Sequence, residues 1–208
     1  MNIELKQVSK VLGGVTVLGN ISYTFNGGKV YGLRGKNGCG KTMLMRSVAG
    51  LMKPTSGNIM IDNKQLYKDM DVPDSIGILI ENPSFLPEYT GYKNLKMIAD
   101  IKKISGEGEV RKTLELVGLN PFDKRKVRKY SLGMRQRLGV AAAVMEKPDI
   151  ILLDEPINAI DEEGVVQIRK LISSLVNERR IIIVACHDRE ELDMLADEVL
   201  LMENGRLV

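Results

Sequence analysis

The sequence predicts an α/β fold built around a mainly parallel sheet, and three observations carry this prediction. Segments with the pattern of buried strands alternate with segments of helical periodicity, which is the order that a parallel sheet requires. Residues 150–153 and 181–186 are apolar throughout, as in strands that are covered on both faces. Residues 35–40 form a glycine-rich loop between a short strand and a helix, a place where the chain must turn sharply.

The N-terminal part of the chain is predicted to consist mostly of strands. Apolar residues and β-formers fall into five short runs that turn residues separate. These runs are 3–8, 17–25, 29–33, 58–61 and 76–80. A helix is expected after the glycine loop, because Leu44, Met45 and Val48 fall on one face and Gly50 ends the pattern.

The middle of the chain is predicted to form a helical lobe. Residues 91–146 read mainly as helices, and glycine and proline residues interrupt them. The breaks are Gly106, Gly118 and Pro121, and a new helix starts at Ser131. We therefore expect a single domain over 1–208, in which a helical subdomain, 86–146, is inserted into an α/β core made of 1–85 and 147–208.

The C-terminal part returns to the α/β pattern. A helix over 161–178 is expected between the two apolar strands, with Asp161 as its N-terminal cap. A short helix is expected from Asp188, and a closing hairpin is expected around Asn204-Gly205. The alternation of strands and helices is therefore predicted to continue to the end of the sequence.

Composition narrows the class of protein. Hydrophobic residues make up 44% and charged residues 27% of the 208 residues, which favours an ordered globular protein over a disordered one. The 30 basic and 27 acidic residues nearly balance, and the resulting net charge of +3 is too small to indicate nucleic acid as the main partner. No apolar run reaches the roughly 18–20 residues of a membrane helix, and the N-terminus lacks a signal-peptide pattern. Cys39 and Cys186 do not form a metal-type pair, so we expect a reducing cytoplasmic setting.

The motif GKNGCGKT at 35–42 predicts a phosphate-binding loop. It matches the pattern G-x-x-x-x-G-K-[ST] in full. Glycines allow successive backbone N–H groups to face an anion, and the start of the following helix adds partial positive charge. Lys41 is expected to reach the outer phosphates, and the Thr42 hydroxyl is expected to bind Mg²⁺. The residues expected to bind ATP are Gly35, Lys36, Asn37, Gly38, Cys39, Gly40, Lys41, Thr42 and Met43.

A second motif, IILLDEP at 150–156, places two carboxylates at the end of a buried strand. Ligands of open α/β sheets bind at the carboxyl ends of the strands. Alone, such a pair is better explained as a solvated strand end, because a strand followed by Asp-Glu is common. Beside a phosphate loop, Asp154 is predicted to hold Mg²⁺, and Glu155 is predicted to polarise the water that attacks the γ-phosphate. Together the two motifs indicate a P-loop nucleotidase.

The segment YSLGMRQR at 130–137 narrows the family further. It resembles the signature motif of ABC ATPases, and the order of phosphate loop, signature, Asp-Glu strand and lone His187 agrees over essentially the whole chain. The SLGM variant resembles the ATP-binding subunits of bacitracin-type and related drug or peptide exporters. The resemblance implies a RecA-like core with a mainly parallel sheet, a small antiparallel β part and an inserted helical lobe.

The resemblance also implies roles for residues outside the phosphate loop. In the family the signature contacts the ATP that is bound to the other subunit of a dimer. Here those residues are Ser131, Leu132, Gly133 and Met134. Ser131 is also a good N-cap for the helix that follows it.

Three further positions carry expected roles. Glu81 takes the place of the family's Q-loop glutamine and offers Mg²⁺ a charged oxygen; a surface glutamate before a proline is the alternative. Asp161 resembles the D-loop aspartate that lies at the dimer interface, and it is equally a plain helix cap. His187 takes the place of the family's switch histidine, which bonds the γ-phosphate; a structural histidine is the alternative.

The sequence leaves two questions open: which residue contacts adenine, and whether the thiol of Cys39 is reactive. The family stacks an aromatic residue on adenine, and Leu12 is the nearest equivalent by spacing, with apolar contact in place of stacking. The aromatic alternatives are Tyr23, Phe25 and Tyr31. The thiol of Cys39 sits near a helix N-terminus, which can lower a thiol pKa; a chance occupant of a variable loop position is the alternative.

The resemblance implies an ATP- and Mg²⁺-dependent ATPase that powers a membrane transporter, with export of drugs, peptides or lipid-like compounds as the expected direction. Its expected partners are an integral membrane permease and a second ABC ATPase domain, identical or different, at the cytoplasmic face of the membrane. The alternatives are an ABC-type ATPase that acts on ribosomes or DNA, and a P-loop kinase. The former usually carries two such domains in tandem, and the latter needs no signature segment.

Overall fold

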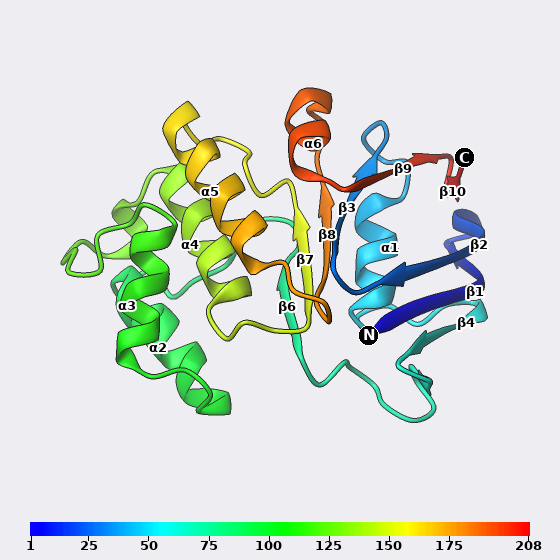
Figure 1. Cartoon of the computed structure of the whole chain (residues 1–208), viewed down its shortest axis with the longest axis horizontal. Helices are drawn as coiled ribbons and strands as arrows, with labels where there is room; N and C mark the ends of the chain where they lie inside the picture. The colour runs from blue at the N-terminus through cyan, green and yellow to red at the C-terminus, as the bar shows by residue number, and fades with distance from the viewer.

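The computed structural model describes all 208 residues and contains two sheets (Figure 1). The smaller sheet is antiparallel and has the strand order β2-β1-β4-β5. Its strands are β1 (Asn2–Leu12), β2 (Val15–Asn26), β4 (Ser56–Ile61) and β5 (Lys64–Gln65). Gly13 and Gly14, with φ values of 54° and 81°, form the tight turn between β1 and β2. Residues other than glycine rarely adopt this backbone conformation, which explains why glycine occupies both positions.

The larger sheet has the order β10-β9-β3-β8-β7-β6. Its strands are β3 (Lys29–Arg34), β6 (Ile76–Leu79), β7 (Ile150–Asp154), β8 (Ile181–Ala185), β9 (Glu198–Glu203) and β10 (Arg206–Leu207). All neighbours from β9 to β6 pair in parallel, and only β10 pairs antiparallel with β9. The predicted α/β fold with a mainly parallel sheet and a small antiparallel part is confirmed.

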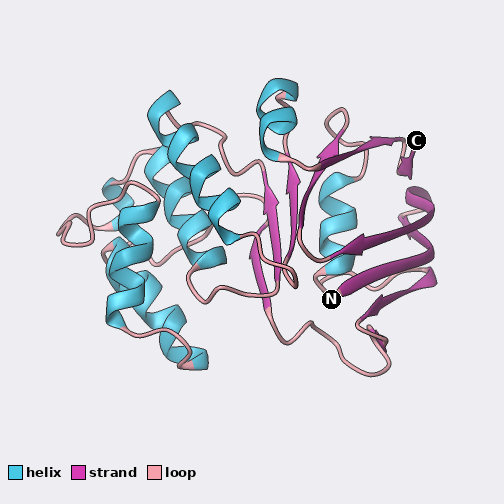
Figure 2. Ribbon diagram, in the orientation of Figure 1, coloured by secondary structure: helices cyan, strands magenta, loops and turns pink.

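Six α-helices and one 3₁₀ turn connect these strands (Figure 2). They are α1 (Lys41–Val48), α2 (Gly91–Lys102), α3 (Glu107–Leu116), η1 (Val127–Lys129), α4 (Leu132–Val144), α5 (Glu162–Leu175) and α6 (Arg189–Leu195). The prediction that α5 continues to 178 is wrong. Val176 is extended, and the Asn177 side chain accepts hydrogen bonds from the N–H groups of Arg179 and Arg180, which turns the chain into β8.

Two hydrophobic clusters form the core, one on each face of the parallel sheet. One cluster packs α1 between the two sheets, where Figure 1 shows it. The other joins the helices α2 to α5 to the opposite face of β7 and β8. The helical lobe therefore shares one hydrophobic core with the parallel sheet and has no separate core. The division into 1–85, 86–146 and 147–208 stays a prediction.

The strand order decides where the functional candidates meet. β3, β8 and β7 lie next to one another and run in the same direction, with Leu33 beside Ala185 and Ala185 beside Asp154. The carboxyl ends of these strands lie at one edge of the sheet. The glycine loop follows β3, Glu155 follows β7, and His187 closely follows β8. Segments that are far apart in sequence are thus brought to one place.

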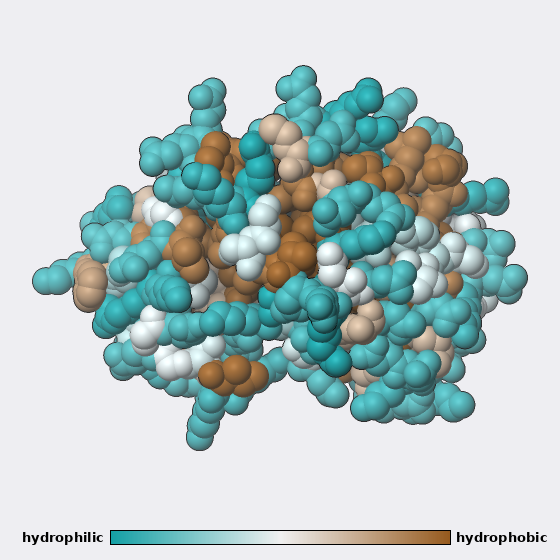
Figure 3. Space-filling model, in the orientation of Figure 1, coloured by the Kyte–Doolittle hydropathy of each residue, from teal (hydrophilic) through white to brown (hydrophobic).

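The face of the molecule seen in Figure 3 is mostly hydrophilic. Figure 3 shows polar side chains over most of one face, with apolar side chains gathered in its middle and towards the β9–β10 end. None of the helices combines the length with the apolar composition that crossing a bilayer requires.

Candidate functional site

The glycine loop after β3 has the backbone that its sequence predicts. Gly38 and Gly40 have φ values of 79° and 110°, which residues other than glycine rarely adopt. A Cβ at Gly40 would lie 2.9 Å from the carbonyl oxygen of Val17, and one at Gly35 would lie 2.3 Å from that of Met202. Gly40 leads directly into α1, whose first turn carries no acidic residue. The N-terminal end of α1 therefore offers an anion its free N–H groups and partial positive charge.

Lys41 folds back over this loop. It is buried, and its Nζ donates to the carbonyl oxygens of Gly35 at 2.6 Å and Lys36 at 3.3 Å. These bonds hold the ammonium group inside the curve of the loop. There it is placed to bind phosphate oxygens in exchange for the two carbonyls.

Thr42 and Asp154 bring α1 and β7 together. The Thr42 hydroxyl donates to Asp154 Oδ2 at 2.6 Å, and Asp154 is only 8% exposed. Burial raises the pKa of Asp154, and the hydrogen bond from Thr42 opposes that rise. A buried carboxylate beside a hydroxyl supplies the hard oxygen ligands that Mg²⁺ prefers, and a cation would offset the unfavourable burial of the negative charge. The residues present therefore fit a Mg²⁺ site.

Glu155 and His187 form a contacting pair at the ends of β7 and β8. His187 Nδ1 lies 2.7 Å from Glu155 Oε2. Glu155 has a φ of 49°, a left-handed conformation that costs a non-glycine residue about 1–3 kcal/mol. Its N–H donates to Ala185 O at 2.8 Å, and its carbonyl oxygen accepts from Gln136 Nε2 at 2.7 Å. Backbone strain at this point accompanies a carboxylate that faces the site.

A cleft of about 520 Å³ joins the glycine loop, Thr42, Asp154 and Glu155, whereas His187 does not line it. It is lined by Leu12, Val17, Asn37, Gly38, Gly40, Lys41, Thr42, Met43, Glu81, Asp154 and Glu155. Three of the residues expected to bind ATP, Gly35, Lys36 and Cys39, line a separate hollow against β9, and their part in ATP binding stays a prediction. Cys39 is buried, and its sulfur lies close to Gly35. Its side chain therefore packs behind the loop and does not face the cleft.

The structure reduces the number of candidate residues for contact with adenine. Leu12 lies at the end of β1 and lines the cleft, as its spacing predicts, together with Val17. The aromatic alternatives do not line the cleft. They form an edge-to-face cluster with ring centroids 4.8–6.2 Å apart, in which Phe25 and Tyr31 are buried and Tyr23 is partly buried. Neither Leu12 nor Val17 can stack on a base as an aromatic ring does.

Glu81 lines the cleft, but its carboxylate has a partner of its own. Arg46 Nη2 donates to Glu81 Oε1 at 2.6 Å. Glu81 also adopts a left-handed backbone with a φ of 61°, and its negative charge helps to raise the pKa of Asp154. A role for Glu81 as a Mg²⁺ ligand stays a prediction, and it involves competition with Arg46.

The signature residues lie outside the cleft of their own chain. Ser131 caps α4, with its Oγ accepting from Met134 N at 3.1 Å, so the predicted cap is confirmed. Leu132 is 55% exposed at the start of the helix. Gly133 lies so close to Ala159 that a Cβ would be 2.6 Å from its carbonyl oxygen. The glycine therefore allows α4 to approach the segment that follows Glu155.

Asp161 is a helix cap, as predicted, and also an ion-pair partner. Its Oδ1 accepts from Gly164 N at 2.8 Å and from Arg137 Nη2 at 2.6 Å. Arg137 follows Gln136 on α4. The signature helix is thus tied at two consecutive residues to the segment between β7 and α5, a connection that motif matching did not predict.

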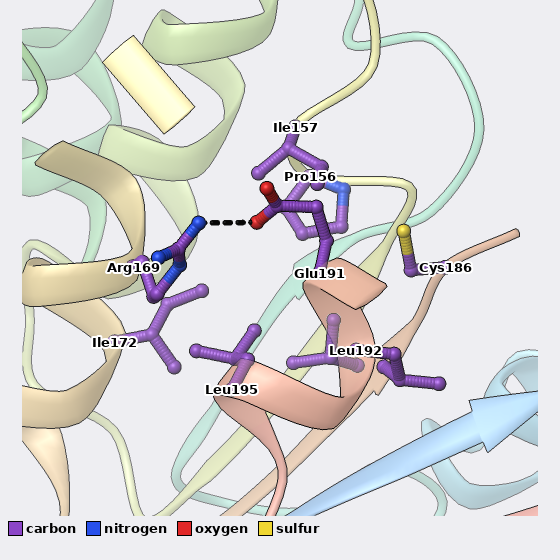
Figure 4. A pocket seen from close by; sticks show the side chains of 9 residues that line it. Pro156, Ile157, Arg169, Ile172, Cys186, Glu191, Leu192 and Leu195 are labelled. Atoms are coloured by element: carbon purple, nitrogen blue, oxygen red, sulfur yellow. Dashed lines mark hydrogen bonds and ion pairs between the residues drawn. The ribbon is translucent and has the colours of Figure 1, made fainter. Parts of the chain in front are cut away.

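A small hollow lies on the other side of that segment (Figure 4). Pro156 and Ile157 form part of its wall, and the ion pair between Arg169 and Glu191, at 2.6 Å, joins α5 to α6 across it. Its volume of about 10 Å³ is too small for a nucleotide and is close to that of a single water. This region supports the chain after Glu155 and does not form a second ligand site.

Two contacts of the site were not foreseen from the sequence. Arg46 lies four residues after Thr42, so helical periodicity places both on the same side of α1, and that signal was available. Gln136 carries no comparable signal, because its partner is the backbone of Glu155, 19 residues away.

Comparison with known proteins identifies the family. The model of the ABC transporter family matches residues 18–158. The chain is 47% identical over 205 residues to the ABC transporter ATP-binding protein YybJ of Bacillus subtilis, covering 99% of this chain and 94% of that protein. It is 39% identical to the bacitracin transport ATP-binding protein BcrA of Enterococcus faecalis, covering 99% of this chain and 68% of BcrA.

A solved structure shares the fold. It is an ATP-binding cassette, determined as a dimer in a post-hydrolysis state with ADP and Pi bound. The TM-score is 0.87 with 23% identity, covering 99% of this chain and 96% of that one. The chain is therefore an ATPase of the ABC transporter family and belongs to the ATP-binding proteins of the branch that includes the bacitracin transporters.

Proposed function

We propose that the protein is the ATP-hydrolysing subunit of a membrane transporter and exports drugs, peptides or lipid-like compounds together with a separate permease. The observation that carries the proposal is the meeting of the phosphate loop with two pairs, Thr42–Asp154 and Glu155–His187, at one edge of the sheet. The similarity to BcrA supports the exporter branch.

The nucleotide is proposed to lie along the cleft. Leu12 and Val17 provide apolar contact for the base, and the N–H groups of the glycine loop bind the phosphates. Lys41 binds the outer phosphates. Mg²⁺, when bound, neutralises phosphate charge, and Thr42 and Asp154 would hold it.

Glu155 is proposed to orient and deprotonate the attacking water. Its carboxylate needs a fixed direction for this role, and His187 supplies a hydrogen-bonding partner at 2.7 Å. His187 is also proposed to bond the γ-phosphate and to respond to its loss. Because the side chain of His187 is largely exposed, it is free to turn from Glu155 towards a bound nucleotide.

Two ATPase domains are proposed to enclose two ATP molecules. Ser131 and Leu132 are exposed at the start of α4 and do not line the cleft of their own chain. A hydroxyl at a helix N-terminus is suited to a phosphate supplied from outside. We infer that a second ABC ATPase domain, identical or different, supplies that phosphate at the cytoplasmic face of the membrane.

The nucleotide-binding part is tested with Lys41→Ala. Removal of the ammonium group is expected to weaken ATP binding by about 10- to 100-fold, as loss of a charge-assisted hydrogen bond does. Binding of a fluorescent ATP analogue measures this directly. Lys36→Ala is the matched control, since its side chain lies outside the cleft. Equal affinities for the two variants would place the phosphates elsewhere.

The transporter part is tested by co-purification. The expected result is a complex with a multi-span membrane protein encoded in the neighbouring reading frame, whose reconstitution into vesicles stimulates ATP hydrolysis. Association with ribosomes or DNA in place of such a protein would favour the alternative ABC class.

A further inference from the structure

We propose that Gln136 is a positioning residue for hydrolysis, whose side-chain amide holds the backbone of Glu155 and thereby aims the Glu155 carboxylate. This inference rests on the proposed function, because it takes Glu155 as the group that orients the attacking water. Gln136 itself lies on the signature helix α4 and does not line the nucleotide cleft.

The contact is short and partly buried. Gln136 Nε2 donates to the carbonyl oxygen of Glu155 at 2.7 Å. Gln136 is only 7% exposed, so water cannot readily replace it at that carbonyl. Loss of the amide would leave the carbonyl oxygen of Glu155 without this donor at a partly buried position, which is unfavourable.

The backbone of Glu155 needs to be held because its conformation is strained. A φ of 49° lies in the left-handed region, which persists only where surrounding contacts enforce it. Here two contacts act on the same residue: Ala185 O accepts from its N–H at 2.8 Å, and Gln136 donates to its carbonyl oxygen. Without the second contact, the residue can relax, and its carboxylate turns away from His187.

The neighbours of Gln136 show that α4 and this segment are joined as a unit. Arg137 donates to Asp161 at 2.6 Å, at the far end of the same segment. Pro156 and Ile157 pack on the opposite side, against the hollow of Figure 4. The bond between Gln136 and Glu155 therefore connects the signature helix to the reacting centre of the same chain.

The inference is tested with Gln136→Met, which keeps an unbranched side chain of similar length and removes the donor. We expect kcat for ATP hydrolysis to fall by at least about tenfold, the effect of losing one hydrogen bond of this kind. The KM for ATP and the affinity for a fluorescent ATP analogue are expected to stay within about twofold, because Gln136 does not touch the nucleotide cleft.

The matched control is Gln167→Met. Gln167 lies against the same helix, where its Oε1 accepts from Arg137 at 3.4 Å, and it does not contact Glu155. The kcat of the Gln167→Met variant is expected to stay near that of the parent protein. If Gln136→Met does not fold, Gln136→Asn replaces it, since an amide that is one methylene shorter cannot reach the Glu155 carbonyl. Thermal unfolding of every variant establishes that folded protein is compared.

A double variant separates positioning from general destabilisation. In a Glu155→Gln background, Gln136→Met is expected to cause no further loss of the residual rate, because there is no carboxylate left to aim. An additive loss, a rise in KM without a fall in kcat, or an unchanged kcat in the single variant would overturn the inference. If Glu155→Gln itself hydrolyses ATP at the parent rate, the proposed role of Glu155 fails first.

Discussion

Arg46 and Glu81 form an ion pair at the edge of the nucleotide cleft, with Arg46 Nη2 2.6 Å from Glu81 Oε1. By the family resemblance, Glu81 is expected to take the place of a neutral glutamine, and its negative charge acts on the nearby Asp154. An arginine on α1 compensates that charge. If Glu81 binds Mg²⁺, as we propose, it must leave Arg46 to do so, and the ion pair is then expected to affect the metal dependence of the site.

The first prediction concerns this pair. Arg46→Met is expected to lower the Mg²⁺ concentration that half-saturates nucleotide binding by about two- to fivefold, the range that an exposed ion pair provides. Glu81→Gln is expected to retain hydrolysis and to raise that concentration, because a charged ligand is lost. The double variant is expected to behave as Glu81→Gln alone. Binding of a fluorescent nucleotide, titrated with Mg²⁺, measures all three.

The control for the ion pair is Arg128→Met. Arg128 makes a similar exposed contact, 3.2 Å from Glu88, away from the cleft. Its Mg²⁺ titration is expected to match that of the parent protein. Identical titrations for Arg46→Met, Glu81→Gln and the parent would count against any direct contact between Glu81 and Mg²⁺.

The second prediction concerns Glu155. Glu155→Gln keeps the shape of the side chain but removes the base, so hydrolysis is expected to fall by about 100-fold or more while ATP binding persists. An ATP-bound dimer is expected to accumulate, which size-exclusion chromatography with light scattering detects. Glu162→Gln, an exposed carboxylate in the first turn of α5, serves as the control. Hydrolysis near the parent rate in Glu155→Gln would remove it from the role of base.

The third prediction concerns stability at the opposite end of the strands. Arg180 is 8% exposed and donates to the carbonyl oxygens of Pro148 at 2.6 Å, of Lys147 at 2.7 Å and of Leu175. Arg180→Met leaves these three carbonyls without a donor, and we expect a loss of about 2–4 kcal/mol in the free energy of unfolding. Urea denaturation measures this loss.

Its neighbour in sequence provides the control. Arg179 pairs with Asp149 and Asp62, but its side chain is 60% exposed. Arg179→Met is therefore expected to change the free energy of unfolding by less than about 1 kcal/mol. Equal losses for the two variants would show that burial at Arg180 does not decide its contribution.

The fourth prediction concerns the two thiols. Burial raises the pKa of Cys186 to about 11, so the thiol stays protonated, and therefore unreactive, until the pH approaches that value. Iodoacetamide at pH 8 is expected to label Cys186 only after unfolding, as mass spectrometry can show. ATP is expected to leave the labelling rate of Cys39 within about twofold, because its side chain lies outside the cleft. Rapid labelling of Cys186 in the folded protein, or strong protection of Cys39 by ATP, would contradict this account.

The sequence alone predicted the elements with strong local signals. The apolar strands β7 and β8, the helix after Gly40 and the caps Ser131 and Asp161 are confirmed. Each of these depends on residues close to one another in sequence. The predicted end of α5 was wrong because the side chain of Asn177 competes with the helix for backbone N–H groups.

The candidate site divides in the same way. The motifs predicted the phosphate loop, Asp154 and Glu155, since each motif combines a local backbone shape with the residue that the chemistry needs. The role of His187 came from the family resemblance. The motifs did not predict that the side chain of Cys39 packs away from the cleft. That depends on β9, which pairs with β3 from a distant part of the chain.

The sequence by itself therefore determined the class of fold, the family resemblance and the residues that are proposed to carry the phosphate chemistry, because local periodicity and short motifs encode them. Only the tertiary structure decided which groups touch: Thr42 with Asp154, Arg46 with Glu81, and Gln136 with the backbone of Glu155. The reason is physical. Strand order and helix packing bring together residues that lie 19 to 112 positions apart in the sequence. A local sequence pattern cannot predict a contact between residues so far apart.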